Sequence, residues 1–214
     1  MSIIDTIRAL LDQLGAFLRG ETGPSAQQAE TYLDELFGRF PFTERAQSWL
    51  RQEIRVRIDD LHSTSGGGGW YADQRLVRLH TAQYEAAIHE LAHALWHTWR
   101  QDRAHRDAFV AAVQRLAEDE DPQWARLHAL ARDYVHGIPT QPGFEQGMLL
   151  PEAQWGSGGG PRGEWNDWEM YAGLASGCMA DVRLLPAYVR EYYADLFREL
   201  PPDAPPPEVE APHG

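Results

Sequence analysis

Two histidines and a glutamate in the segment His89-Glu90-Leu91-Ala92-His93 have the types and spacing of a metal site. Histidines four residues apart lie on one face of a helix, so both can point a ring nitrogen at one ion. Zinc suits neutral imidazole, with bonds of about 2.0–2.1 Å. Glu90 lies about 100° round the helix from His89, where its carboxylate can reach a water on the metal without being a ligand. The segment therefore predicts one zinc ion and a base that takes a proton from water during attack on a peptide carbonyl.

Apolar residues fill the other positions of this helix, which indicates that the motif is buried. They are Ile88, Leu91, Ala92, Ala94 and Leu95. Two histidines and a glutamate buried there without a metal would be costly, which favours a metal over a chance match among the nine histidines of the chain. His97 lies one further turn along, but ligands at i, i+4 and i+8 span about 12 Å of rise, which is too far for one ion. We therefore expect His97 to lie outside the ligand set.

A catalytic zinc usually has three protein ligands and one open position, so a third ligand must come from elsewhere in the chain. The segment 165–176 predicts a helix whose first turn carries Glu169 among aromatic and small residues, and such a helix can pack close to the motif helix. A glutamate in a first turn can also serve only the helix dipole. The apolar surroundings favour Glu169 as the ligand, with Glu164, Asp167 and Asp181 as competitors.

These residues resemble a known family. The HExxH motif at His89, followed at a distance by a helical glutamate in an aromatic and alanine-rich segment, resembles the gluzincin branch of the zincin metallopeptidases. Glu169-Met170-Tyr171-Ala172 is similar to the Glu-Phe-Phe-Ala-Glu signature of the anthrax lethal factor catalytic-domain type. The resemblance covers about residues 54–100 and 165–180. It implies that His89, His93 and Glu169 bind zinc, that Glu90 is the general base, and that a small sheet lies upstream.

The chain also departs from that pattern. Gly173 stands where the family has a second glutamate, four residues after the ligand, so its supporting role is missing or supplied from elsewhere. The spacing from His93 to Glu169 is 76 residues, which is long for a minimal zincin. The metzincin pattern fails, because Trp96 and Trp99 stand where its glycine and its third histidine would be.

Hydrolysis of a peptide bond also needs a donor for the oxyanion. Tyr171, Tyr134 and His136 are the candidates, and we assign Tyr171 as the catalytic donor. Packing in the core or exposure on the surface is the alternative for each of them. The segment from Gly69 to His80 can offer a free strand edge that binds an extended peptide. Five aromatic residues are candidates for lining substrate subsites: Trp70, Tyr71, Trp155, Trp165 and Trp168.

The elements that position these residues follow from the spacing of apolar side chains. Residues 2–19 predict an amphipathic helix, Ser25 can cap a second helix, and Thr43 can cap a third. Residues 54–58 alternate between apolar and charged types, as a half-buried strand does. The glycine-rich run 63–69 predicts a flexible loop.

Two short strands, at 70–71 and 76–80, should precede the motif helix, with Val77 and Leu79 on one face. Thr81 can cap the motif helix, which should continue to about residue 100. Further helices are predicted near 103–118, 122–135, 166–180 and 186–200.

This order of elements predicts an α+β fold, a mostly helical zincin-like domain with a small sheet preceding the motif helix. We expect one domain over residues 1–200, with an N-terminal helical elaboration, and a disordered proline-rich tail over residues 201–214. In residues 137–163 the apolar residues have neither helical nor strand spacing. So long a segment without regular structure is either functional or disordered. Part of it, residues 140–163, is a candidate for blocking the cleft as a built-in inhibitor.

Composition limits the classes of partner. The 214 residues carry a formal net charge of -13, which argues against nucleic acid or an anionic membrane as the main partner. No apolar run approaches the roughly 18 residues of a membrane span, and the N-terminal segment lacks the features of a signal peptide. The single cysteine, Cys178, excludes an internal disulfide framework, so a cytoplasmic protein is the expectation.

The sequence therefore predicts an enzyme, a zinc metalloendopeptidase with one zinc ion per chain that acts on a peptide or protein. One alternative is a zincin-like zinc-binding or regulatory protein whose activity is impaired, for which Gly173 is the motive. A metal-free helical interaction domain is a further alternative, against which the pairing of His89 with His93 speaks.

Overall fold

The computed structural model describes residues 24–59, 68–80, 83–100, 102–136 and 167–207. Within them, seven α-helices and one three-stranded sheet form the α+β fold that the sequence predicts. The helix predicted at 2–19, the segment 137–163, Thr81 and Glu164 lie outside the described residues.

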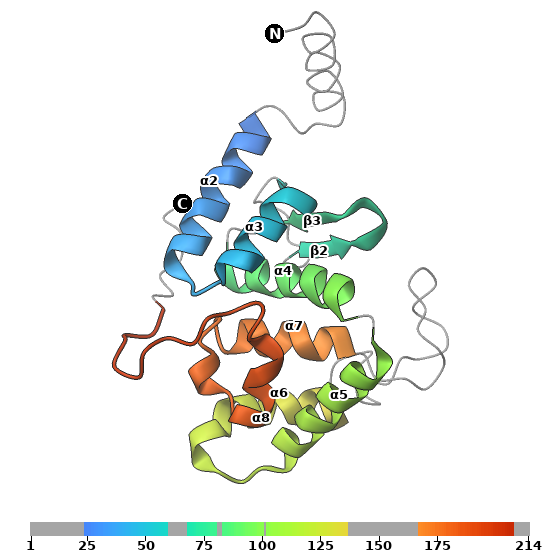
Figure 1. The fold of residues 1–214 in the computed structure, drawn as a ribbon, viewed down its shortest axis with the longest axis vertical. Helices are drawn as coiled ribbons and strands as arrows, with labels where there is room; N and C mark the ends of the chain where they lie inside the picture. Colours follow the sequence, from blue (N-terminus) through green and yellow to red (C-terminus); the bar gives the residue numbers. More distant parts are fainter. Residues whose placement is uncertain (1–23, 60–67, 81–82, 101, 137–166, 208–214) are drawn as a thin grey trace, which may run out of the picture.

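The motif helix α4 (Tyr84–Trp99) lies in the middle of the molecule (Figure 1). On one side of it lie α2 (Pro24–Arg39), α3 (Glu44–Glu53) and the sheet. On its other side lie the helices that follow it in the chain. Because both sides are covered, every residue of α4 from Ala87 to Trp96 except His89 is buried.

The sheet has the strand order β1-β3-β2, so β2 is an edge strand. It consists of β1 (Arg55–Ile58), β2 (Gly68–Tyr71) and β3 (Leu76–Leu79). β3 pairs with β1 in parallel and with β2 in antiparallel orientation. Val77 and Leu79 are both buried, which confirms the predicted face. β2 packs against α4 and so brings its edge to the motif.

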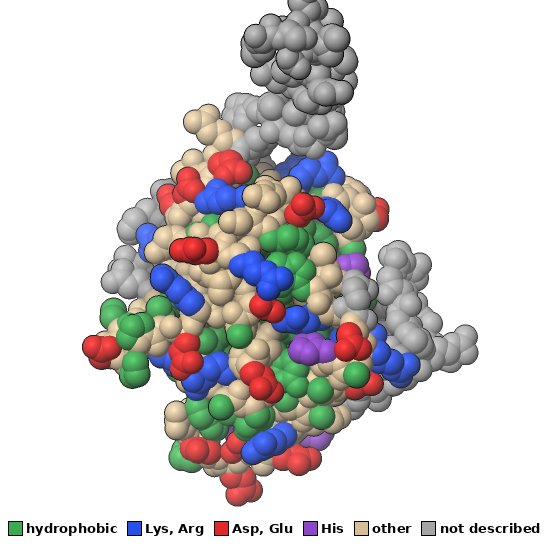
Figure 2. Space-filling view, in the orientation of Figure 1, with side chains coloured by type: hydrophobic (Ala, Val, Ile, Leu, Met, Phe, Trp, Pro, Cys, Tyr) green, Lys and Arg blue, Asp and Glu red, His purple; other side chains and the backbone are tan. Residues whose placement is uncertain are grey.

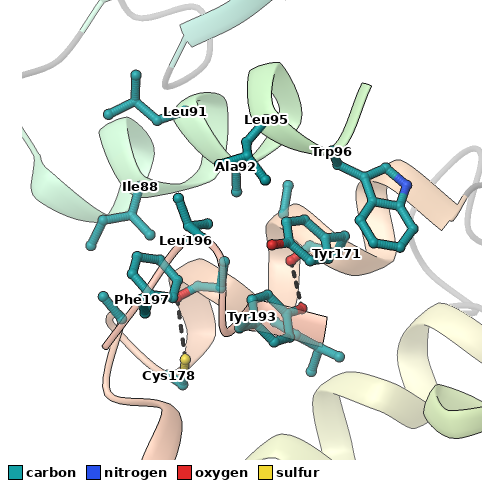
Figure 3. Close-up of a cluster of buried hydrophobic side chains, with 14 of the residues drawn as sticks. Ile88, Leu91, Ala92, Leu95, Trp96, Tyr171, Cys178, Tyr193, Leu196 and Phe197 are labelled. Atoms are coloured by element: carbon teal, nitrogen blue, oxygen red, sulfur yellow. Dashed lines mark hydrogen bonds between the residues drawn. The ribbon is translucent and has the colours of Figure 1, made fainter. Parts of the chain in front are cut away.

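On the other side of α4, α5 (Arg103–Glu118) is followed by a 3-10 turn at Pro122–Trp124 and by α6 (Ala125–His136). α7 (Asp167–Gly177) then runs beside α4 (Figure 1). Small buried residues such as Ala172 and Ala175 keep α7 compact. Figure 3 shows the shared core, in which Ala92 and Trp96 of α4 face Tyr171 of α7.

Local capping signals place some helix ends but not others. Thr43 caps α3 as predicted, because its Oγ1 accepts a hydrogen bond from the Ala46 N–H at 3.1 Å. Ser25 is not a cap, since α2 already begins at Pro24. α4 begins at Tyr84 after Gln83, whose side chain makes no capping bond, so the prediction that Thr81 caps this helix is wrong.

The C-terminal part differs most from the prediction. In place of a helix over 186–200, a short helix α8 (Ala187–Arg190) leads into a 3-10 turn at Glu191–Tyr193. The chain leaves the helix because its backbone pairs with residues 41–43: the Arg198 N–H donates to the Pro41 carbonyl oxygen at 2.8 Å, and the Leu196 carbonyl oxygen accepts from the Thr43 N–H at 2.9 Å.

The structure describes the tail that follows as far as residue 207. The Arg183 guanidinium donates hydrogen bonds to the carbonyl oxygens of Pro201 and Ala204, at 2.6 and 2.9 Å. These bonds join residues 201 and 204 to the 3-10 turn at Val182–Leu184, and the predicted disorder of the tail stays a prediction.

Acidic and basic side chains are interspersed over the face shown in Figure 2. Some of them join neighbouring helices, as where Arg51 of α3 contacts Glu30 and Asp34 of α2 at 2.7 and 2.6 Å. Such exposed pairs add little stability, because water screens the charges. None of the described helices is long and apolar enough to cross a membrane.

Candidate metal centre

Three of the predicted site residues meet between α4 and α7. His89 and His93 come from α4, and Glu169 comes from the first turn of α7. The Nε2 atoms of the two histidines lie 3.0 Å apart. One carboxylate oxygen of Glu169 lies 3.3 Å from His89 Nε2, and the other lies 3.3 Å from His93 Nε2. The structure thus brings three ligand atoms to one point, all within 4.8 Å of one another.

These separations fit the edges of a tetrahedral zinc site. Zinc bonds of about 2.0–2.2 Å to nitrogen and oxygen place neighbouring ligands about 3.3–3.6 Å apart. The two histidine nitrogens lie 3.0 Å apart, and each lies 3.3 Å from a different carboxylate oxygen of Glu169, which is close to that range. Two imidazoles with one glutamate are also a donor set that catalytic zinc sites use. The residues present therefore fit a zinc ion in both chemistry and size.

Hydrogen bonds alone account for this cluster less well. A neutral imidazole carries one N–H donor and one acceptor nitrogen. If both Nε2 atoms donate to Glu169, two N–H groups face each other at 3.0 Å with no acceptor between them. A cation at the centre removes this conflict, because all three groups then donate electron pairs to it.

The charges of the cluster also favour metal binding. Burial opposes ionisation of Glu169, but the hydrogen bonds and charges of His89 and His93 outweigh it and hold the pKa of this carboxyl well below its usual range. Burial lowers the pKa of His89, and Glu169 outweighs that effect and raises it. An ionised carboxylate is the form that a metal needs. His89 and Glu169 keep 25% and 27% of their side-chain surface exposed, so the centre is open on one side.

Glu90 lies beside the ligand atoms without being one of them. Its side chain is buried, and the edge strand β2 approaches it at Gly68. Burial raises the pKa of Glu90, while His93 and His89 act in the opposite direction and only partly offset it. A raised carboxyl pKa brings the group closer to neutral pH, where a general base works best.

Gly68 allows β2 to approach Glu90 so closely. A Cβ atom at this position would lie 2.6 Å from the Arg78 carbonyl oxygen and 3.0 Å from Glu90 Cγ. The prediction of a flexible loop over 63–69 is therefore wrong for Gly68 and Gly69, which begin β2. At Gly68 the glycine signal in the sequence marks a close approach of the backbone to another element.

Tyr171 is not part of the site, and its assignment as the oxyanion donor is wrong. Its side chain is 0% exposed and is stacked between Trp96 and Tyr193, with ring centroids 4.3 and 4.4 Å away (Figure 3). Its hydroxyl donates to the Tyr192 carbonyl oxygen at 3.4 Å. The reason is geometric: two residues after Glu169 correspond to about 200° round the helix, so the two side chains leave α7 on opposite faces.

Two competitors for the third ligand have other partners. Asp167 accepts a hydrogen bond from Trp96 Nε1 at 2.6 Å, on the face of α7 away from the ligand atoms. Asp181 caps the 3-10 turn at Val182–Leu184 and pairs with Arg183 at 2.7 Å. Neither belongs to the converging group of ligand atoms.

Other candidates lie near the centre or away from it. His97 is outside the ligand group, as expected, and its ring lies between Trp70 and Trp168 at centroid distances of 6.4 and 6.5 Å. These two tryptophans of the predicted subsites therefore flank the motif helix one turn beyond His93. His136 ends α6 with an exposed side chain.

Comparisons of the chain with protein-family models, with curated proteins and with solved structures find no match. The geometry of the centre is therefore the basis for a functional proposal.

Proposed function

We propose that this protein is a zinc-dependent metalloendopeptidase that hydrolyses bonds of a peptide or protein substrate. One observation carries the proposal: the two histidine nitrogens of α4 and the carboxylate oxygens of Glu169 on α7 converge at 3.0–3.3 Å, close to the separations of neighbouring zinc ligands, with the buried carboxylate of Glu90 next to them. The resemblance of the motif to the gluzincin metallopeptidases supports the same conclusion.

In this proposal His89, His93 and Glu169 would hold the metal. A zinc ion supplies a Lewis acid that polarises a carbonyl group and makes water more acidic. Glu90 takes up a proton from the attacking water at its carboxylate and then passes it to the nitrogen of the leaving amine.

The substrate would lie along the edge strand. β2 pairs with β3 on one side only, and it packs against the helix that carries the ligands. An extended peptide adds to such an edge through main-chain hydrogen bonds, which carry little sequence specificity by themselves. Trp70 and Trp168 lie at this end of the site and are candidates for contacts with substrate side chains. We also propose a cytoplasmic location, which the single, buried Cys178 supports.

Metal analysis tests the proposal directly. Protein purified without chelator should contain one zinc ion per chain, and a strong chelator should abolish cleavage of an unstructured protein such as casein. Adding back zinc should restore it, because the ligands are held by packed helices and remain in place. Less than about half an equivalent of zinc per chain would contradict the proposal.

Substitution of Gly68 tests the contact between β2 and Glu90. We expect Gly68→Ala to lower the initial rate of cleavage by at least about tenfold while one zinc stays bound, because the added methyl displaces Glu90 or the strand. Gly38→Ala is the matched control, since a Cβ atom there meets nothing within 4 Å. Equal rates for the two variants would show that the contact at Gly68 has no part in catalysis.

A further inference from the structure

A contact between α6 and α7 lies directly below the metal centre. Gly173 is four residues after Glu169, so it lies on the same face of α7, one turn further along. A Cβ atom on Gly173 would lie 1.6 Å from the hydroxyl oxygen of Tyr134 and 2.2 Å from its Cζ. The phenol of Tyr134 therefore occupies the space that any side chain at position 173 would need.

Glycine at position 173 lowers the stability of α7, which indicates that the contact with Tyr134 has a role. Glycine inside a helix is less stable than alanine by about 1 kcal/mol, and Gly173 is in the interior of α7. Alanine would also keep α7 compact, as Ala172 and Ala175 do. What alanine would not allow is the hydroxyl of Tyr134 against the helix backbone.

The surroundings of Tyr134 place its hydroxyl near both helices that carry ligands. Tyr134 is buried, and burial raises the pKa of its hydroxyl, with further contributions from Glu169, Asp133 and Glu85. Glu169 is the ligand on α7, and Glu85 lies one turn before the ligand His89 on α4. Tyr134 thus contacts α7 at Gly173, one turn beyond the ligand Glu169.

We propose that Tyr134 is a positioning residue of the metal centre, whose hydroxyl, seated against Gly173, orients Glu169 and the adjoining ligand helices for metal binding. Metal ligands generally depend on such outer groups, whose loss weakens metal binding by about 10–100-fold. The inference rests on the proposed zinc site. It also explains Gly173. A side chain at position 173 could bring a polar group to the metal site, and the hydroxyl of Tyr134 on α6 supplies that group instead.

The test is Tyr134→Phe, which keeps the ring and removes only the hydroxyl. We expect zinc to bind about 10–100-fold more weakly in competition with a chromophoric chelator. We also expect the visible absorption of the cobalt-substituted protein to change, since that spectrum reports the geometry of the ligands. Tyr188→Phe is the matched control, because the Tyr188 hydroxyl bonds to Asp119 at 3.0 Å, away from the centre.

Gly173→Ala is the reciprocal change and should weaken zinc binding as well, because its Cβ atom displaces the Tyr134 hydroxyl. Gly177→Ala on the same helix is its control, since a Cβ atom there meets the flexible ends of Leu130, at 2.5 Å, and Leu127, at 3.5 Å. Thermal unfolding of the metal-free variants shows whether each is folded. Tyr134→Phe keeps the test decisive even if Gly173→Ala does not fold.

The outcomes separate the two proposals. If the wild-type protein binds no zinc, the proposed function fails and this inference fails with it. If the wild-type protein binds one zinc and Tyr134→Phe matches it in zinc affinity and in cobalt spectrum, only the positioning role is overturned. Tyr134 then serves packing alone.

Discussion

Glu90→Gln should retain one zinc ion per chain and lose peptide cleavage by about 10²–10⁴-fold, the contribution of a positioned general base. The amide has nearly the same shape as the carboxylate, and Glu90 is not among the converging ligand atoms, so the metal should stay. The amide cannot take up a proton from water at neutral pH. Zinc content and initial cleavage rates, measured on the same preparation, check both parts of this expectation.

The control for this variant is Glu118→Gln, at the exposed end of α5, which should cleave like the wild-type protein. Unchanged cleavage by Glu90→Gln would remove Glu90 as the base. A wild-type protein that holds zinc and cleaves nothing would instead favour the alternative of a zincin-like zinc-binding or regulatory protein.

Glu169→Ala is expected to weaken zinc binding by more than the 10–100-fold that loss of an outer hydrogen bond costs, because it removes a direct ligand. Two histidines remain, and no other described acidic side chain converges on them. The wild-type and variant zinc affinities can be compared by competition with a chelator.

Asp167→Asn, two residues earlier in α7, is the matched control. It should keep the zinc affinity of the wild-type protein, and the fold should be retained, because the amide oxygen of asparagine can still accept the hydrogen bond of the Trp96 indole. An unaltered zinc affinity in Glu169→Ala would move the third ligand to Glu164, the remaining competitor.

The parts of the site that could be predicted from sequence are those set by local geometry. Residues four apart share a face of any helix, so His89 and His93 had to converge once a helix formed there. The alternation of residues 54–58 and the Thr43 cap likewise depend on neighbours a few positions away. The small sheet before the motif helix followed from the same local patterns.

The side chains around α7 show where such reasoning stops. Glu169 and Tyr171 are neighbours in sequence with similar surroundings, and only the packing of α7 against α4 decides that one meets the histidines and the other fills the core. A helix pattern without a clear polar face, as in α7, does not reveal which side meets which partner. The assignment of Tyr171 failed for this reason.

The sequence by itself determined the pair of histidines, the glutamate proposed as the base and the helix that carries them. All three depend only on the spacing of residues within one helix. The tertiary structure decided which carboxylate completes the triangle, which strand covers Glu90 at Gly68, and which tyrosine lies over Gly173. Each of these contacts joins segments far apart in the chain. They depend on how whole helices and strands pack, and side-chain volume and backbone clearance settle that packing only once the fold is complete.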